Sequence, residues 1–191
     1  MEASARTYRF LPGDVYTAGY RIVGKIMVAT NGIMGVLNDI TKSHLEIHDA
    51  RLARIHMPTK LVDHYEVVRL VKAQIFAVCT TRREDIGPHA IVRGGYSNVQ
   101  NVPSRLITSV YELEGKLEVA GRFDFVTLIA DKTRNFVPMF DATLTAILIP
   151  NLKVESPGIL FNREKIDILA MLNQRVKEEK PQAAAPQTHA S

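Results

Sequence analysis

The stretch GKIMVA, from Gly24 to Ala29, is written again as GKLEVA from Gly115 to Ala120, ninety-one positions later. A tyrosine stands four places before each of the two glycines. With an offset of 91 over residues 20–29 and of 92 over residues 34–58, 12 of 35 compared positions are identical. Unrelated sequences of average composition would agree at about two. The sequence therefore predicts that one structural unit occurs twice.

Each unit has the residue pattern of a small β structure. Valine and isoleucine alternate with polar residues over residues 20–29, which is typical of a strand. GIMGVLNDIT, beginning at Gly32, spaces its apolar residues like one face of a short helix. HLEIHDARLARIHMP and its counterpart FVPMFDATLTAILIP predict either a pair of strands or one long bent strand.

Three pairs of residues mark corresponding points of the two units. In each unit an aspartate precedes an alanine where the alternation changes phase, which indicates a β-bulge or a tight turn. A proline then follows, and we expect it to end strand pairing because proline has no N–H. Together with the opening glycines, these residues define the repeat: Gly24, Gly115, Asp49, Asp141, Pro58 and Pro150.

About sixty residues and four or so strands are too few for a sheet to bury enough apolar surface alone. We therefore predict a mostly β fold, α+β at most. It would consist of two tandem small barrel-like β units related by a pseudo-twofold axis, each with one short helix or turn. The predicted divisions are an N-terminal segment 1–19, β repeat unit 1 at 20–79, a connector 80–108, β repeat unit 2 at 109–172 and a disordered tail 173–191.

The run VLND followed by HLEIHDARL, within Val36–His56, resembles bacterial proteins of unknown function. Their small domain carries a Leu-Asn pair, a short gap, and an alternating strand that ends in Asp-Ala. The resemblance implies an Sm-like small β-barrel. It covers about 25 residues of the first unit, whereas the second unit has Ile-Ala-Asp where the Leu-Asn pair would stand. It implies no chemistry and no functional residue.

Composition narrows the class of protein. Hydrophobic residues make up 46% and charged residues 23%, which fits a folded globular chain rather than a disordered one. No apolar run approaches the roughly 18 residues of a membrane helix, and none has the position of a signal-peptide core. The single cysteine, Cys79, cannot form an internal disulfide. We expect a cytoplasmic protein that does not bind membranes.

Histidines cluster in the first unit. His48, His56 and His64 are spaced eight apart, and an even spacing on a regular strand places side chains on one face. Such imidazoles could hold zinc or sense pH. The second unit has apolar residues where His48 and His56 stand, which favours packing or solvated histidines. We therefore assign no metal site, no cofactor and no catalytic residue, and keep these three histidines as metal candidates.

Basic residues gather in the first unit and the connector. Residues 20–79 carry eight Lys or Arg against five Asp or Glu, whereas residues 109–172 carry seven against nine. A basic groove with aromatic platforms can bind single-stranded nucleic acid, although aromatic residues are few in this chain. The candidate phosphate contacts are Arg51, Arg54, Lys60, Arg82, Arg83 and Arg93.

Three functions remain open from the sequence. Two oppositely charged units of one kind suit docking within or between chains, which favours a non-enzymatic interaction or assembly module whose partner is a protein, either itself or another. One alternative is binding of RNA or single-stranded nucleic acid through the basic first unit and connector. The other is small-ligand binding, or an enzyme site, between the two units.

Overall fold

The computed structural model describes residues 8–88, 99–121, 124, 126, 128 and 134–172. Within these residues the chain forms ten β-strands, the helix α1 and three short 3-10 helices. In chain order they are β1 (Arg9–Tyr16), β2 (Tyr20–Val28), α1 (Gly32–Leu37), β3 (His44–Arg54), β4 (Leu61–Val71), η1 (Lys72–Gln74), β5 (Ala77–Thr80), η2 (Arg83–Ile86), β6 (Val99–Thr108), β7 (Tyr111–Ala120), β8 (Phe136–Ala146), β9 (Ile149–Asn162), η3 (Arg163–Lys165) and β10 (Ile166–Met171).

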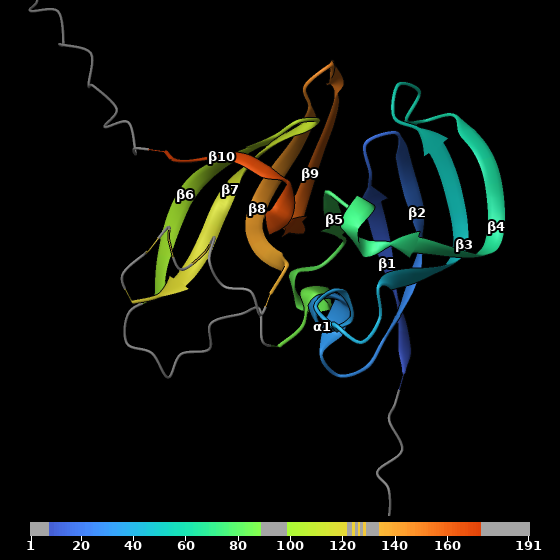
Figure 1. Cartoon of the computed structure of the whole chain (residues 1–191), viewed down its shortest axis with the longest axis horizontal. Coiled ribbons are helices and arrows are strands. Elements are labelled where there is room, and N and C mark those ends of the chain that lie inside the picture. The colour runs from blue at the N-terminus through green and yellow to red at the C-terminus, as the bar shows by residue number, and fades with distance from the viewer. Residues whose placement is uncertain are drawn as a thin grey trace, which may run out of the picture.

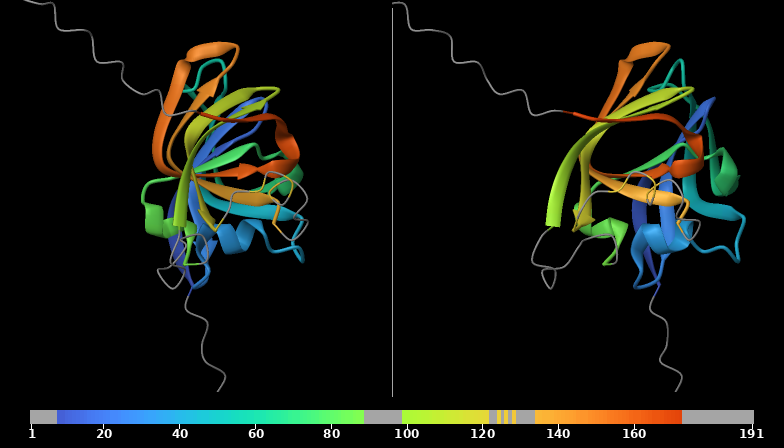
Figure 2. Two further views of the ribbon diagram at one scale, coloured as in Figure 1. Left: turned by 90° about the vertical axis from the view of Figure 1, so that its left-hand side faces the viewer. Right: turned by 60° about the vertical axis from the view of Figure 1, so that its left-hand side comes forward.

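The prediction of a mostly β fold is confirmed. All ten strands join one open antiparallel sheet in the order β10-β6-β7-β8-β9-β5-β1-β2-β3-β4. We call β1–β5 with η2 the first half and β6–β10 the second half, and Figure 1 shows them side by side. The strands are strongly twisted, as Figure 2 shows. The sheet continues from one half into the other through β5 and β9, so the halves are not two separate sheets.

The two halves meet head to tail. The junction pairs β5, the last strand of the first half, with β9, the fourth strand of the second half. A twofold axis would pair equivalent surfaces with each other, whereas β5 and β9 occupy different places in their halves. The junction is therefore not the contact between equivalent strands that the expected pseudo-twofold axis implies, and the end strands β4 and β10 lie at opposite ends of the sheet.

The same hairpin contact occurs in both halves. In the first half, the Thr17 hydroxyl donates to Tyr20 O at 3.2 Å and accepts from Tyr20 N–H at 3.0 Å. In the second half, Thr108 makes the equivalent bonds with Tyr111 at 3.0 and 2.9 Å. Each threonine closes the turn between the first two strands of its half, β1–β2 or β6–β7. The tyrosines that precede the repeated glycines therefore mark strand starts.

The predicted bulge is present in the first half. Pairing between β2 and β3 jumps from Val23–Arg51 to Lys25–His48, so Asp49 and Ala50 lie opposite Gly24. Asp49 has a φ of 49°, in the left-handed region that aspartate tolerates better than most residues. A Cβ on Gly24 would lie 2.8 Å from the backbone oxygen of His48. Glycine is required at position 24 because the bulged strand approaches so closely.

The second half has the same bulge. Pairing between β7 and β8 jumps from Glu114–Thr143 to Lys116–Phe140, opposite Gly115. Asp141 has a φ of 46°, and its carboxylate accepts from Lys116 Nζ at 2.8 Å, which lowers the pKa of Asp141. In the first half, Lys25 Nζ lies 3.5 Å from Asp49 Oδ2. In each half, the glycine of the repeated Gly-Lys pair thus allows the strands to approach closely. The lysine pairs with the aspartate of the bulge.

The prolines differ in their roles. Pro58 lies in the turn between β3 and β4, beyond the end of β3 at Arg54, so its missing N–H leaves no gap in the ladder. Pro150 lies inside β9 instead. The pairing of β8 with β9 jumps there from Thr145–Lys153 to Ala146–Ile149. Pro150 therefore occupies an irregular part of the ladder, where its missing N–H is tolerated.

Two predicted boundaries need correction. The N-terminal segment 1–19 contains β1, and the connector 80–108 contains η2 and β6, so both segments contribute strands to the sheet. Pro103 is unusual within a strand because proline has no N–H. Its carbonyl accepts from Leu172 N–H, one residue beyond the last β6–β10 pair at Ser104. A residue of an antiparallel strand points its N–H and C=O to the same side, so the missing N–H falls where the neighbouring strand ends. The predicted tail 173–191 lies outside the described residues.

Helix α1 forms where the sequence predicted a short helix. It buries Ile33, Met34 and Leu37. The carbonyl of Met34 accepts from the N–H of Asn38, which caps its C-terminal end. Most of the corresponding stretch of the second half lies outside the described residues. None of the helices described in this chain has the length and apolarity needed to cross a membrane.

Each half completes the core of the other. One core cluster lies in the first half but includes Phe136, Phe140 and Leu160 of the second half. The other lies in the second half but includes Tyr16 and Phe76 of the first half. These shared side chains are buried. Each half therefore relies on its neighbour to exclude water from its core.

We predict that Gly24→Ala and Gly115→Ala each lower the free energy of unfolding by about 1–3 kcal/mol, because the new methyl group collides with backbone across the bulge. The measurement is equilibrium urea unfolding of each variant. Gly19→Ala is the matched control, since a Cβ at Gly19 meets nothing within 4 Å, and its effect should stay within about 0.5 kcal/mol. Equal losses in all three variants would contradict the role of the bulge.

Candidate assembly interface

The junction between the halves is a short strand pairing extended by side chains. β5 and β9 pair from Ala77–Phe161 to Thr80–Gly158. Asn162 lengthens this ladder, because its N–H donates to Phe76 O at 2.8 Å and its side-chain amide donates to Ile75 O at 3.0 Å. The Asn162 side chain is buried and its bonds are satisfied on both sides of the junction.

Hydroxyl groups close the other end of the pairing. Thr80 Oγ1 donates to Gly158 O at 3.0 Å. The Ser156 hydroxyl reaches Thr80 O at 2.8 Å and Gly158 O at 2.7 Å. Thr80, Ser156 and Gly158 are therefore bonded across the junction without access to water, which favours pairing because unsatisfied buried polar groups are costly.

A side-chain amide clamps the halves together at a second point. Asn38, just after α1, donates from Nδ2 to Phe136 O at 2.9 Å and accepts from Phe136 N–H at 2.8 Å. Asn38 is part of the Leu-Asn pair noted in the sequence. This two-way bond imitates a step of a β-ladder, so it fixes the position of the α1 loop against the start of β8.

Aromatic rings fill the space beside the junction. The Tyr111 ring meets Tyr16 and Phe76 edge-on, at centroid distances of 5.9 and 5.6 Å. Its hydroxyl donates to Thr17 O at 2.6 Å. Burial raises the pKa of Tyr111 further above its usual value. Tyr111 therefore supplies both apolar contact and one satisfied hydrogen bond between the halves.

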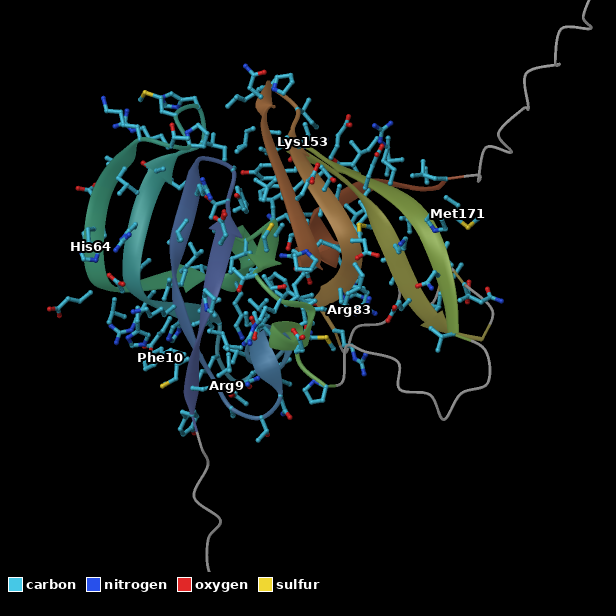
Figure 3. All side chains as sticks on the ribbon, turned by 180° about the vertical axis from the view of Figure 1, so that it is seen from behind. Arg9, Phe10, His64, Arg83, Lys153 and Met171 are labelled. Carbon is cyan, nitrogen blue, oxygen red and sulfur yellow. The ribbon has the colours of Figure 1, made fainter. Side chains whose placement is uncertain are left out.

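The two end strands of the sheet carry exposed apolar side chains. Each end strand has one hydrogen-bonded neighbour among the described residues: β3 for β4 and β6 for β10. Figure 3 places His64 of β4 and Met171 of β10 at opposite ends of the molecule. The exposed large apolar residues of the two strands are Leu61, Val62, Tyr65, Val67, Val71, Ile168 and Met171. An unpaired edge with such side chains is a template for another strand.

A pocket of about 310 Å³ lies beside the junction. Its lining includes Lys72, whose Nζ donates to Asp39 O at 2.7 Å and whose pKa is lowered by burial. Asn38 and Asn162 also line it, and both are bonded to backbone across the junction. The two asparagines connect the halves, whereas the Lys72 bond lies within the first half. A ligand or enzyme site between the halves stays a prediction.

The histidine candidates do not come together. His64 Nε2 lies 2.7 Å from Asp49 Oδ1, whereas His48 meets the Phe10 ring edge-on at 5.0 Å. His56 lies exposed in the turn after β3. The bulge at Asp49 breaks the even spacing on which the zinc prediction rested. In the part of the chain that the structure describes, no group of three His, Cys, Asp or Glu side chains could hold a metal ion.

Three of the candidate nucleic-acid contacts are exposed. Arg51 and Arg54 lie on β3, and Lys60 lies in the turn before β4. Arg93 lies outside the described residues. The exposed cations therefore sit near the β4 end of the sheet, and binding of nucleic acid there stays a prediction.

The other two arginine candidates form ion pairs within the chain. Arg82 pairs with the buried carboxylate of Asp85 at 2.9 Å. Arg83 pairs with Glu118 of β7, and its guanidinium lies 4.0 Å from the centroid of the Phe140 ring. Arg83 thus connects η2 of the first half to β7 and β8 of the second, which is a contact of the junction.

The sequence analysis did not predict β1 and β6 as strands, nor that β4 and β10 lie at the ends of the sheet. A signal for β1 and β6 was present, because Pro12 corresponds to Pro103 and Thr17 to Thr108 at the same offset of 91. The position of the end strands had no local signal, since β4 carries apolar residues on both faces, as a buried strand does.

Comparison of this chain with protein-family models, with curated proteins and with solved structures finds no match.

We predict that Asn38→Asp lowers the free energy of unfolding by about 1–3 kcal/mol at neutral pH, because a carboxylate cannot donate to Phe136 O and places two acceptors together. Urea unfolding measures the loss. Asn151→Asp, at an exposed position of β9, is the matched control and should change little. An unchanged Asn38→Asp variant would contradict the clamp.

Proposed function

We propose that this chain is a non-enzymatic assembly module that binds polypeptide by adding a strand at the open edges of its sheet. The main support is that β4 and β10 lie at the two ends of the sheet and expose apolar side chains. Strand addition supplies main-chain hydrogen bonds, and the side chains of the edge give specificity. The internal β5–β9 pairing shows the kind of contact that the fold makes.

The proposal includes the origin of the fold. The two halves are two copies of one small barrel-like β unit of Sm-like type, each unit made of five strands. Supporting observations are the recurring threonine turn, the two glycine–aspartate bulges and the 3-10 helix before the last strand of each half. A unit of this size buries too little apolar surface to be stable alone. A neighbouring unit that pairs with its edge therefore contributes to its stability.

Synthetic strands provide a direct test. We expect a labelled peptide of residues 72–82, with Cys79→Ala, to bind the β4 edge, because within the chain this segment pairs with β9. A peptide of residues 154–164 should bind the β10 edge for the matching reason. Fluorescence anisotropy against the full chain measures binding, and hydrogen exchange should slow in β4 with the first peptide and in β10 with the second.

Two controls sharpen this test. Scrambled peptides should not bind, and Val67→Lys should weaken the 72–82 peptide about tenfold, equivalent to about 1.4 kcal/mol. Leu148→Lys is the matched control, since Leu148 is equally apolar and 90% exposed but lies in the β8–β9 turn. Saturable binding at neither edge would overturn the proposed function.

A further inference from the structure

The strands of the internal junction have counterparts at the two ends of the sheet. At the offset of 91, β5 residues Ala77–Thr80 correspond to residues 168–171 of β10, and β9 residues Gly158–Phe161 correspond to residues 67–70 of β4. The 3-10 helices before β5 and β10 keep the same offset. Pairing to the inner neighbour keeps it too, since Tyr16–Ala77 corresponds to Ile107–Ile168. The sheet therefore ends at both sides in half of a junction.

Positions that the internal junction buries are exposed at the ends. A buried residue of the junction and its exposed counterpart at an end strand form three pairs: Ala77 at 0% and Ile168 at 53%, Thr80 at 3% and Met171 at 61%, Asn162 at 2% and Val71 at 52%. The three exposed residues are all large and apolar. Burying them would remove apolar surface from water, as the internal junction does.

We propose that a second copy of this chain covers these edges, with β4 of one copy paired antiparallel to β10 of the next in the register of the internal junction. This inference rests on the proposed function and names its partner. Transposing the internal pairs by 91 positions gives the contacts between copies: Leu70 with Ile168, Arg69 with Leu169, Val68 with Ala170 and Val67 with Met171.

A second copy fits because one chain carries both members of the pair. Joining β4 to β10 leaves another β4 and another β10 at the outer ends, so the contact repeats from copy to copy. Head-to-tail contacts of this kind close into a ring when the rotation between copies allows it and otherwise extend into a filament. The internal junction already sets one such rotation between the halves.

Two substitutions make the contact between copies weaker than the internal one. Arg69 stands where Leu160 is buried, and its Nε donates to Glu46 at 2.9 Å. Val67 stands where Gly158 packs, and a Cβ at Gly158 would lie 2.3 Å from Ile86 of η2. The junction between copies is therefore less apolar and lacks that close contact, so we expect association that depends on protein concentration.

Engineered thiols test the register. The background is Cys79→Ala, since alanine stands at the corresponding position 170. Two single variants, Val68→Cys and Ala170→Cys, are mixed and oxidised. Directly opposed antiparallel residues lie within disulfide reach, so the mixture should give dimers that contain one of each variant. Each variant oxidised alone should give at least about tenfold less dimer, because a head-to-tail contact does not bring like strands together.

A slipped pair is the matched control. Val67→Cys mixed with Ala170→Cys displaces one thiol by one residue, which turns it to the other face of the sheet. It should give at least about tenfold less dimer than the in-register pair. Equal yields from the two mixtures, or dimers of one variant alone, would overturn the proposed register.

The unaltered chain supplies a measurement that depends on no variant. Sedimentation velocity should show a mass that rises above 21.3 kDa with concentration, and Met171→Lys should shift that rise to higher concentration whereas Leu148→Lys should not. A monomer at every concentration would overturn the inference. If the strand peptides bind while the chain stays monomeric, the proposed function stands and self-association fails; if neither occurs, both fail.

Discussion

The pairing of β5 with β9 is the contact on which the rest of this molecule depends. It makes one sheet from two halves and brings Phe136, Phe140 and Leu160 into the core of the first half. In return, Tyr16 and Phe76 enter the core of the second. The ladder has only four residue pairs, and burial of the large side chains that each half contributes to the core of the other also stabilises the arrangement.

The repeated Gly-Lys phrase expresses a steric constraint. A bulge in β3 and another in β8 bring backbone against β2 and β7, and only glycine fits at the point of approach. The phase change in the sequence was therefore enough to predict both bulges and their aspartates. The α1 helix was predictable for a similar reason, because its apolar residues Ile33, Met34 and Leu37 all pack inward.

Other parts of the fold depend on pairing between distant segments, which local periodicity does not encode. Gly13–Ala18 and the prolines of β1 and β6 have residue types typical of loops. Their place in the sheet becomes clear only when the neighbouring strands are known. The head-to-tail order follows from the register of β5 against β9, eighty residues apart along the chain. The candidate site was missed for the same reason: Val67 and Ile168 each lie beside another apolar residue, as in a buried strand, and only the sheet order leaves them exposed. The even spacing of His48, His56 and His64 does not bring them to one face, because the bulge at Asp49 changes the face on which the following side chains lie.

The close likeness between the internal junction and the sheet ends has a consequence for how the chain folds. Cys79 must find Ile159 across a long stretch of chain, and such contacts form late because loop closure is costly. During that delay β5 is open to the fourth strand of any neighbouring molecule. Refolding at high protein concentration would then yield domain-swapped molecules, in which halves from different chains share a core. The yield of native protein should therefore rise as the protein is diluted before refolding.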